Sequence, residues 1–244
     1  MSARDRLFNS LVEEAQDFVF DERVVRVFPD MINRSVPGYG LIVPLIGLLA
    51  RRYAQDNSTL YDLGCSLGAC ALAMSQAVRA ANARIVAVDN SPAMIGRLRE
   101  TLVNAHTPGC VPIHPVCEDL QETRVANASV VVLNFTLQFV SPGARLPLLR
   151  RIAQGLLPGG ILLLSEKIRF DSDAEQALQT TWHYDFKRAQ GYSELEISGK
   201  RDALENVMKP DSLPQHHERL LQAGFNSIHP WFQAFSFRSL IAFR

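Results

Sequence analysis

The sequence predicts an α/β protein built on an open, mostly parallel, seven-stranded sheet. The hydrophobic segment 59–63 precedes a glycine-containing turn and an alanine-rich helical segment, and a second hydrophobic segment, 84–89, ends in Asp89. A glycine turn between a strand and a helix lets a ligand approach the backbone closely. An acid at the tip of the next strand can accept hydrogen bonds from ribose hydroxyls. We therefore expect a nucleoside cofactor at the ends of these two strands.

The part of the chain before the first strand, residues 1–55, is expected to form a helical arm. Residues 21–28 have an amphipathic pattern, which Pro29 and the turn at 37–40 are expected to interrupt. The apolar run 41–50 contains a proline and a glycine and is too short to span a bilayer. We expect it to form a buried helix.

Five strand–helix units are expected to follow the arm. The fourth strand is β-branched and almost wholly apolar, which is typical of a central parallel strand, whereas the third is weak. The expected strands are residues 59–63, 84–89, 111–117, 129–135 and 161–165. Ser91 and Pro92 are a typical N-cap and first-turn proline for the helix after the second strand.

The C-terminal third is expected to add a helical insertion and an antiparallel hairpin. Residues 168–210 are polar and mostly helical in pattern, and a helix at 215–223 ends at Gly224, a typical C′ glycine. Residues 227–244 contain two strand-like runs, which favour a hairpin at the sheet edge. We predict a single domain over 1–244, made of the arm 1–55, the cofactor-binding core 56–167, the insertion 168–210 and a closing segment 211–244.

The composition indicates no strong attraction to polyanions. Twenty-five Lys and Arg residues balance twenty-five Asp and Glu residues, so no overall field favours direct binding of nucleic acid or of an anionic membrane. The four cysteines form no CxxC pair and have no histidines at ligand spacing, so we expect no metal site. Without a signal-peptide pattern, they are expected to be free thiols in a reducing cytoplasm.

The turn after the first strand indicates which nucleoside cofactor is bound. Its sequence, Asp62-Leu63-Gly64-Cys65-Ser66-Leu67-Gly68, has the spacing D-x-G-x-[GS]-x-G and not the G-x-G-x-x-G of dinucleotide-binding proteins. This spacing resembles the first motif of class I S-adenosylmethionine (SAM) methyltransferases, which implies their Rossmann-like fold and SAM as the ligand. Ser66 stands where most such loops have glycine. The alternative is a glycine turn that only closes a strand–helix unit.

Ligands of open α/β sheets bind beyond the carboxyl ends of the strands, and this rule selects the candidate site residues. Asp89 is expected to hold the ribose, Asp119 to accept from the adenine amino group, and the Leu120 backbone to contact the ring edge. Asn134 ends an apolar strand and either meets the amino-acid end of the cofactor or caps the following turn. The other candidates at the strand ends are Gly64, Cys65, Ser66 and Asn90.

A few further residues have a plainer interpretation. Tyr39 lies in a turn where the N-terminal segment could close over the cleft, or it is a half-buried surface aromatic. We expect His216 and His217 to be solvated, and residues 182–187 to be helix packing with exposed charge. Cys65 needs no nucleophilic role, since a small side chain is enough in the loop.

Longer motifs extend over nearly the whole chain, from about residue 4 to the C-terminus. They comprise residues 21–24, 28–32, 34–39, 61–69, 89–95, 131–139, 164–167, 183–188, 191–198, 200–201 and 204–207. Together these motifs resemble the bacterial carboxy-S-adenosyl-L-methionine synthases, and Ser66 is typical of that family's own loop. Residues 117–120 depart from the family pattern, which often has glycine and isoleucine there, but they keep the acid and an aliphatic neighbour.

The resemblance implies a reaction other than methyl transfer. It implies that SAM and prephenate are converted into carboxy-SAM, phenylpyruvate and water. A separate enzyme would then use carboxy-SAM to place a carboxymethyl group on hydroxylated wobble uridine in tRNA. The resemblance also implies a homodimer. The ligand residues that it implies are Tyr39, Gly64, Cys65, Ser66, Asp89, Asn90, Asp119, Leu120, Asn134 and Arg201.

Arg201 is the candidate cation for the new carboxylate, and Tyr39 is the second catalytic candidate. A guanidinium group can bind a carboxylate through two parallel hydrogen bonds, although spacing alone would make Arg201 a solvated helix charge. Two other functions remain open, a SAM-dependent methyltransferase of a small molecule and a non-catalytic SAM-binding module. A dehydrogenase ranks last because the glycine spacing is wrong.

Overall fold

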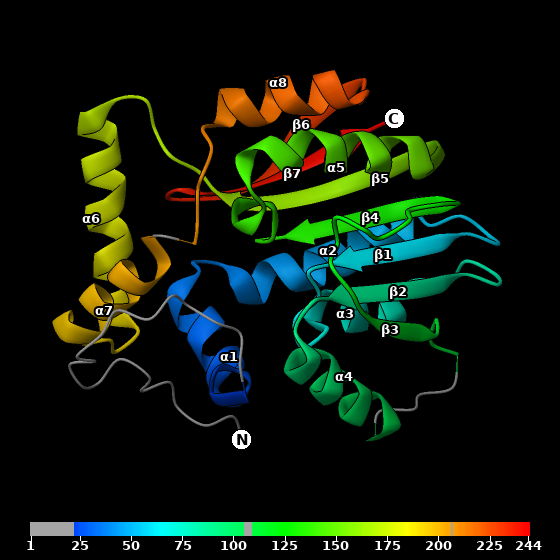
Figure 1. Ribbon diagram of the computed structural model, residues 1–244, viewed down its shortest axis with the longest axis horizontal. Coiled ribbons are helices and arrows are strands. Elements are labelled where there is room, and N and C mark those ends of the chain that lie inside the picture. Colours follow the sequence, from blue (N-terminus) through cyan, green and yellow to red (C-terminus); the bar gives the residue numbers. More distant parts are fainter. Residues whose placement is uncertain (1–21, 105–108, 206) are drawn as a thin grey trace.

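A seven-stranded sheet forms the centre of the protein, with helices on both faces (Figure 1). The computed structural model describes residues 22–104, 109–205 and 207–244, without the side chains of 200–205. The expected helical arm before residue 22 therefore lies outside the described residues. The strands are β1 (Thr59–Leu63), β2 (Arg84–Asp89), β3 (Ile113–Cys117), β4 (Ala128–Asn134), β5 (Leu156–Lys167), β6 (Ser227–Ala234) and β7 (Phe237–Phe243). The helices are α1 (Glu22–Ser35), α2 (Tyr39–Tyr53), α3 (Ala69–Ala77), α4 (Pro92–Asn104), η1 (Leu137–Phe139, a 3₁₀ turn), α5 (Pro142–Gly155), α6 (Asp173–Ala189), α7 (Glu194–Glu205) and α8 (Leu213–Ala223).

The strand order is β3-β2-β1-β4-β5-β7-β6. The five strands from β3 to β5 pair in parallel, whereas β7 pairs antiparallel with both β5 and β6. The hairpin therefore joins the sheet through its second strand and leaves β6 at the edge. This arrangement confirms the predicted fold class. It also places the reversal of strand order between β1 and β4, where ligands of open α/β sheets bind.

The central strands are buried on both faces, and their side chains alternate between two apolar cores. Val130 and Val132 of β4 belong to the core formed with α2, α3 and α4. Val131 and Leu133 belong to the core formed with α5 and α8. Because successive side chains of a strand point to opposite faces, one apolar run supplies both cores.

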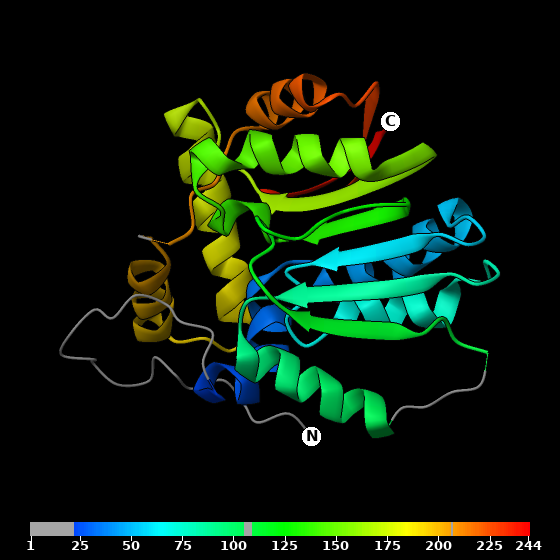
Figure 2. The same ribbon diagram turned by 45° about the vertical axis from the view of Figure 1, so that its right-hand side comes forward.

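One end of the sheet is covered by additional helices. In Figures 1 and 2, α1, α6 and α7 lie beyond the arrowheads of β1, β2 and β4, so they cover the carboxyl ends of the strands. Arg34 of α1 ties two of these parts together, since its Nε donates to the carbonyl oxygen of Gln190 at 2.8 Å and its guanidinium lies 3.8 Å from the centre of the Tyr192 ring. The predicted insertion 168–210 therefore helps to cover the carboxyl ends of the strands.

Pro29 does not interrupt the first helix, and the prediction of a break there is wrong. Helix α1 continues through this proline to Ser35 and ends before the turn at 36–38. Proline removes one helical hydrogen bond and disfavours the helix interior. Here Phe28 and Met31 are buried with Met94 of α4, so packing of the apolar face outweighs the local preference.

Several element boundaries also differ from the expected ones. Strand β4 ends at Asn134 because Phe135 takes a positive φ of 59° and leaves the pleated geometry. Strand β5 begins at Leu156, five residues early, and the glycine-containing turn forms an irregularity in its pairing with β4. Strand β3 begins at Ile113, and α8 begins at Leu213, two residues before the expected start.

Candidate active site

A cavity of about 760 Å³ opens at the carboxyl ends of the strands. It is lined by the ends of β1, β2, β4 and β5, by the loop after β3, by the turn between α1 and α2, by α6, and by residues 208–210. Its volume is within the range of small-molecule sites. The helices beyond the sheet edge therefore enclose one large cavity at the point where the topology predicts a ligand.

The loop from β1 to α3 forms one wall of this cavity. Gly64, Ser66 and Gly68 have positive φ values of 76°, 48° and 80°. A Cβ atom on Gly64 would lie 2.3 Å from the side chain of Thr136, so no larger residue fits there without a shift. Ser66 takes a left-handed conformation, which explains why glycine is usual at this place in related loops.

Asp89 is held at the tip of β2 by two backbone amides. Its Oδ2 accepts from the Ser66 amide at 2.8 Å, and its Oδ1 accepts from the Ser91 amide at 2.9 Å. Burial raises the pKa of Asp89, while these two hydrogen bonds act against the rise. An ionised carboxylate has about four acceptor positions. Two of them thus remain for hydroxyl groups in the cavity.

Asp62 lies deeper, at the end of β1, and is almost fully buried. Its Oδ2 accepts from the amide of Ala71 at 2.8 Å, which satisfies a free donor in the first turn of α3. Burial raises the pKa of Asp62 to about 7, the Ala71 amide opposes the rise, and the charge of Asp89 adds to it. Asp62 therefore both anchors α3 and lines the cavity.

Asn134 and Tyr39 both line the cavity. The buried Oδ1 atom of Asn134 has no hydrogen-bond partner among the described residues, so it does not cap the turn that follows it. Tyr39, the first residue of α2, lines the cavity and has its ring centre 6.5 Å from that of Phe135. Burial, with the nearby Cys70 and Asp62, raises the pKa of Tyr39, so the phenol stays protonated.

The loop after β3 supplies the far end of the cavity. Asp119 Oδ1 accepts from the amide of Gln121 at 2.8 Å, and the carbonyl oxygen of Leu120 accepts from Arg151 at 3.0 Å. These two hydrogen bonds do not involve Asp119 Oδ2 or the backbone amide of Leu120. Both residues line the cavity.

The structure brings together nine of the ten candidate ligand residues. The nine that line the one cavity are Tyr39, Gly64, Cys65, Ser66, Asp89, Asn90, Asp119, Leu120 and Asn134. Arg201 belongs to α7, and its side chain lies outside the described part of the chain.

Two expectations from the sequence are wrong. Residues 182–187 are not simply a packed helix with exposed charge, because His183 and Lys187 are buried and line the cavity. His216 is only 3% exposed and not solvated, and burial lowers its pKa to about 4. In both cases the helix packs against elements that are distant in sequence, so its buried face could not be recognised from its own pattern.

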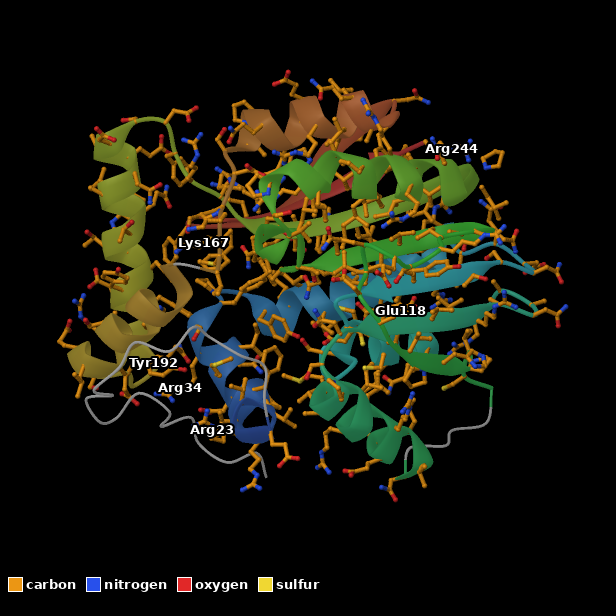
Figure 3. The ribbon with its side chains drawn as sticks, viewed as in Figure 1. Arg23, Arg34, Glu118, Lys167, Tyr192 and Arg244 are labelled. Carbon is orange, nitrogen blue, oxygen red and sulfur yellow. The ribbon has the colours of Figure 1, made fainter. Side chains whose placement is uncertain are left out.

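Sequence reasoning missed a group of cavity residues from β5, α6 and β7. Figure 3 shows Lys167 at the carboxyl end of β5, on the side of α6. Burial lowers the pKa of its amine. His183 is held with its Nε2 2.8 Å from the carbonyl oxygen of Ser35, and burial and the charges of Lys167 and Lys187 lower its pKa to about 3. His183 is therefore a neutral imidazole that donates a hydrogen bond from Nε2. The cations in this part of the cavity are Lys167 and Lys187.

Glu166, next to Lys167, is buried on the other side of the strand. Its two oxygens accept from the amides of Leu137 and Gln138 at 2.8 and 2.9 Å, so the carboxyl group holds the start of η1. Burial raises the pKa of Glu166 to about 8 against these hydrogen bonds. Gln138 in turn accepts from the amide of Lys167 at 3.2 Å, which fixes the loop beside that lysine.

Over residues 22–104, 109–205 and 207–244, no three His, Cys, Asp or Glu side chains gather in a way that could hold a metal ion. No single helix in these ranges has both the length and the apolar character to cross a membrane. Only the pair of α1 and α2, bent by 95°, meets these criteria together.

Known proteins resemble this chain at two levels. A family model described as a methyltransferase domain matches residues 60–160. The carboxy-S-adenosyl-L-methionine synthase of Citrifermentans bemidjiense is 58% identical over 240 residues, which are 98% of each chain. The protein of the same name from Pseudomonas fluorescens is 56% identical over 240 residues, 98% of this chain and 97% of the relative.

Solved structures share the fold at low sequence identity. Human N-acetylserotonin methyltransferase, in complex with SAM, has a TM-score of 0.59 and 15% identity over 91% of this chain and 55% of its own. The mitomycin 7-O-methyltransferase has a TM-score of 0.59 and 18% identity over 91% of this chain and 57% of its own. This chain thus spans just over half the length of those two, and the likeness concerns the fold alone.

Proposed function

The chain belongs to the carboxy-S-adenosyl-L-methionine synthase family, and on that premise we propose that it converts SAM and prephenate into carboxy-SAM, phenylpyruvate and water. One observation carries this proposal beyond the family name. The candidate SAM residues at the ends of β1 to β4 and the cationic and aromatic residues at the ends of β5 and β7 line a single cavity. A reaction between two bound molecules requires them to meet in such a space.

The residues at the strand ends suit SAM as a ligand. Asp89 keeps two acceptor positions toward the cavity and is proposed to hold the ribose. Asp119 and Leu120 are proposed to contact the adenine. The Oδ1 atom of Asn134 is buried and has no hydrogen-bond partner among the described residues, and an ammonium group of the methionine part would satisfy it.

Bound SAM supplies a methyl group made weakly acidic by the neighbouring sulfonium, while prephenate supplies both carbon dioxide and a base as its ring aromatises. In the overall balance, the bond from the ring to its carboxylate breaks as hydroxide leaves, a methyl proton converts hydroxide to water, and the methyl carbon bonds to carbon dioxide. The protein's contribution is to orient the two molecules and to exclude water. The half-buried Tyr39 and the buried Phe135 and Phe237, which all line the cavity, serve that exclusion.

Arg201 is proposed to bind the new carboxylate of the product, as the family resemblance implies. A guanidinium group matches a carboxylate with two parallel hydrogen bonds. We expect Arg201→Ala to keep its affinity for SAM and to lose preference for carboxy-SAM, as measured by calorimetry with both ligands. Equal affinities of wild type and variant for carboxy-SAM would refute this role.

The wider setting is also a proposal that rests on the resemblance. We propose a single-domain chain that acts as a homodimer in the cytoplasm without binding nucleic acid itself. Its product would be used by a separate enzyme that modifies the wobble uridine of tRNA. Size measurement in solution and a search for that modification in cells lacking the protein test these two points.

A methyltransferase acting on a small molecule is the second candidate, favoured by the family model that matches residues 60–160. Incubation with SAM and prephenate separates the two functions. Release of phenylpyruvate in step with loss of SAM supports the synthase. Transfer of label from methyl-labelled SAM to a cell-extract component, without phenylpyruvate release, supports the methyltransferase.

A further inference from the structure

One bulky residue of the cavity has a strained backbone. Phe135, directly after β4, has a φ of 59°, which lies in the left-handed region that large side chains rarely adopt. Among the described residues, the other aromatic residue with a positive φ is Phe235, in the two-residue turn between β6 and β7, where such a conformation is usual. Strand β4 is followed by η1 and not by a hairpin. The conformation of Phe135 therefore needs a different explanation.

Hydrogen bonds on both sides hold Phe135 in this conformation. Its amide donates to the carbonyl oxygen of Ser165 at 2.7 Å, and its carbonyl oxygen accepts from Nε2 of Gln138 at 3.4 Å. Glu166 accepts from the amides of Leu137 and Gln138, so the residues that follow are fixed as well. A strained conformation persists only where the surrounding structure imposes it, and such strain is concentrated at functional sites.

The Phe135 ring belongs to a row of rings that line the cavity. Its centre is 6.5 Å from the ring centre of Tyr39 and 5.9 Å from that of Phe237. The ring of Phe237 is in turn 5.0 Å from that of His183. We name these four side chains the aromatic wall, which is formed by α2, the end of β4, β7 and α6. Phe135 lies inside the row and is 8% exposed.

The aromatic wall begins beside the part of the site proposed for the methionine end of SAM. Phe135 follows Asn134, whose buried Oδ1 is proposed to meet the ammonium group. Consecutive Cα atoms are about 3.8 Å apart, so Phe135 lies next to the residue proposed for that end of the ligand. Thr136, the next residue, lies against Gly64 of the loop after β1. The reacting methyl group belongs to this end of SAM.

The proposed reaction needs an apolar surface at this methyl group. Loss of the methyl proton leaves a carbanion beside the sulfonium, and this carbon has to bond to carbon dioxide. Water would instead return a proton to the carbanion and regenerate SAM, and the hydroxide so formed would convert carbon dioxide to bicarbonate. Phenylpyruvate would still be released, but no carboxy-SAM would form. Exclusion of water prevents side reactions of this kind.

We propose that Phe135 couples the two halves of the reaction, because its ring shields the methyl carbanion from water until carbon dioxide reacts with it. This assignment rests on the proposed function, in which SAM and prephenate react in the one cavity. The backbone strain is then part of the site. It places a large apolar ring at the end of a central strand, where the topology puts the ligand.

The test compares Phe135→Ala with wild type, with SAM and prephenate in buffered D2O. The measured quantities are the ratio of carboxy-SAM formed to phenylpyruvate released, and the deuterium content of the methyl group in recovered SAM. Wild type should form the two products in equal amounts and leave the methyl group unlabelled. In the variant, the missing ring leaves more space than one water molecule needs. We therefore expect the ratio to fall about 3- to 10-fold, which corresponds to a change of roughly 1 kcal/mol in the relative barriers, and deuterium to enter the methyl group.

Phe225→Ala and Phe225→Leu are the matched controls. Phe225, between α8 and β6, is 2% exposed and belongs to the core formed with α5 and α8, and it is not one of the residues that line the cavity. These variants should lose stability, as the Phe135 variants do, and keep the product ratio of wild type. Phe135→Leu keeps an apolar side chain at the aromatic wall, so we expect an intermediate ratio. It carries the test if Phe135→Ala does not fold.

The outcomes separate this inference from the function on which it depends. Wild type that releases no phenylpyruvate from prephenate would overturn both. Active wild type, with Phe135 variants that still form equal amounts of the two products and an unlabelled methyl group, would overturn the role of Phe135 alone, even if kcat falls. The same loss of coupling in the Phe225 variants would also overturn it, since reduced stability would then explain the effect.

Discussion

At the scale of single residues, the two acids Asp89 and Asp62 have different tasks although they end adjacent strands. Asp89 is half-buried and keeps acceptor capacity toward the cavity, whereas Asp62 is buried and serves the first turn of α3. The two acids have different tasks because they are buried to different extents. The acid nearer to solvent remains able to bind a ligand as a carboxylate, and the deeper one is driven toward its neutral form.

Asp89→Asn is expected to weaken SAM binding by about 10- to 100-fold, because it replaces charged acceptors with one neutral acceptor and two donors. Titration calorimetry with SAM measures the effect. Asp171→Asn, at an exposed position after β5, is the matched control and should leave the affinity unchanged. Unchanged affinity in Asp89→Asn would exclude Asp89 from the SAM site.

Asp62 makes stability depend on pH in a predictable direction. Its folded-state pKa is raised from 3.8 to about 7, so the folded protein keeps a proton that the unfolded chain releases. The resulting stabilisation is complete below pH 3.8 and is lost as the pH rises through about 7. Asp62→Asn keeps an acceptor for the Ala71 amide and removes the titration.

The free energy of unfolding of the ligand-free protein, measured with urea at pH 5 and pH 8, tests this assignment. From pH 5 to pH 8, wild type should lose about 2 kcal/mol more than Asp62→Asn, since all other groups titrate alike in both proteins. An equal loss in the two proteins would show that Asp62 ionises normally in the fold.

At the scale of elements, the strands were easier to predict from the sequence than the faces of the helices. The apolar runs of β1, β2 and β4 and the acids at their ends indicated both the sheet and the edge where the cavity lies. The end of β4 at Asn134 could not be read from the sequence, because it depends on the positive φ of Phe135. At Pro29 the local preference predicts the end of a helix, but packing of the apolar face lets α1 continue.

Arg145 of α5 joins several elements behind the cavity. It is 1% exposed, forms an ion pair with Asp211, and donates to the carbonyl oxygens of Gln138 in η1 and of Lys209. Arg219 of α8 donates to the same Asp211 at 2.6 Å. The cluster of Arg145, Asp211 and Arg219 therefore connects the segment that follows the insertion to the core. It lies next to the lining residues Gln138 and Lys209.

Arg145→Met is expected to lower the free energy of unfolding by about 2–4 kcal/mol, because it removes one of the two guanidinium partners of Asp211 and leaves several buried carbonyl groups without their donor. Urea denaturation measures the loss. Arg150→Met, on the exposed side of the same helix, is the control and should change stability by less than about 0.5 kcal/mol. Equal stabilities of the two variants would contradict the role of Arg145 as an anchor.

At the scale of the whole molecule, the cavity exists because segments far apart in sequence close over one edge of the sheet. The candidate SAM residues that line the cavity lie between 39 and 134, and a sequence rule about strand ends could select most of them. Lys167, His183 and Phe237 come from the end of β5, from α6 and from β7, and their meeting depends on how the insertion folds back. No periodicity in one segment carries that information, so this group of lining residues could only be found in the folded chain.

We propose that this protein builds carboxy-SAM from SAM and the ring carboxylate of prephenate. The most direct test is to incubate purified protein with SAM and with prephenate isotopically labelled in that carboxylate, and to weigh the products by mass spectrometry. We expect a labelled SAM-like species in which a carboxyl group replaces one hydrogen, together with unlabelled phenylpyruvate. Unchanged SAM, or only its demethylated product, would contradict it.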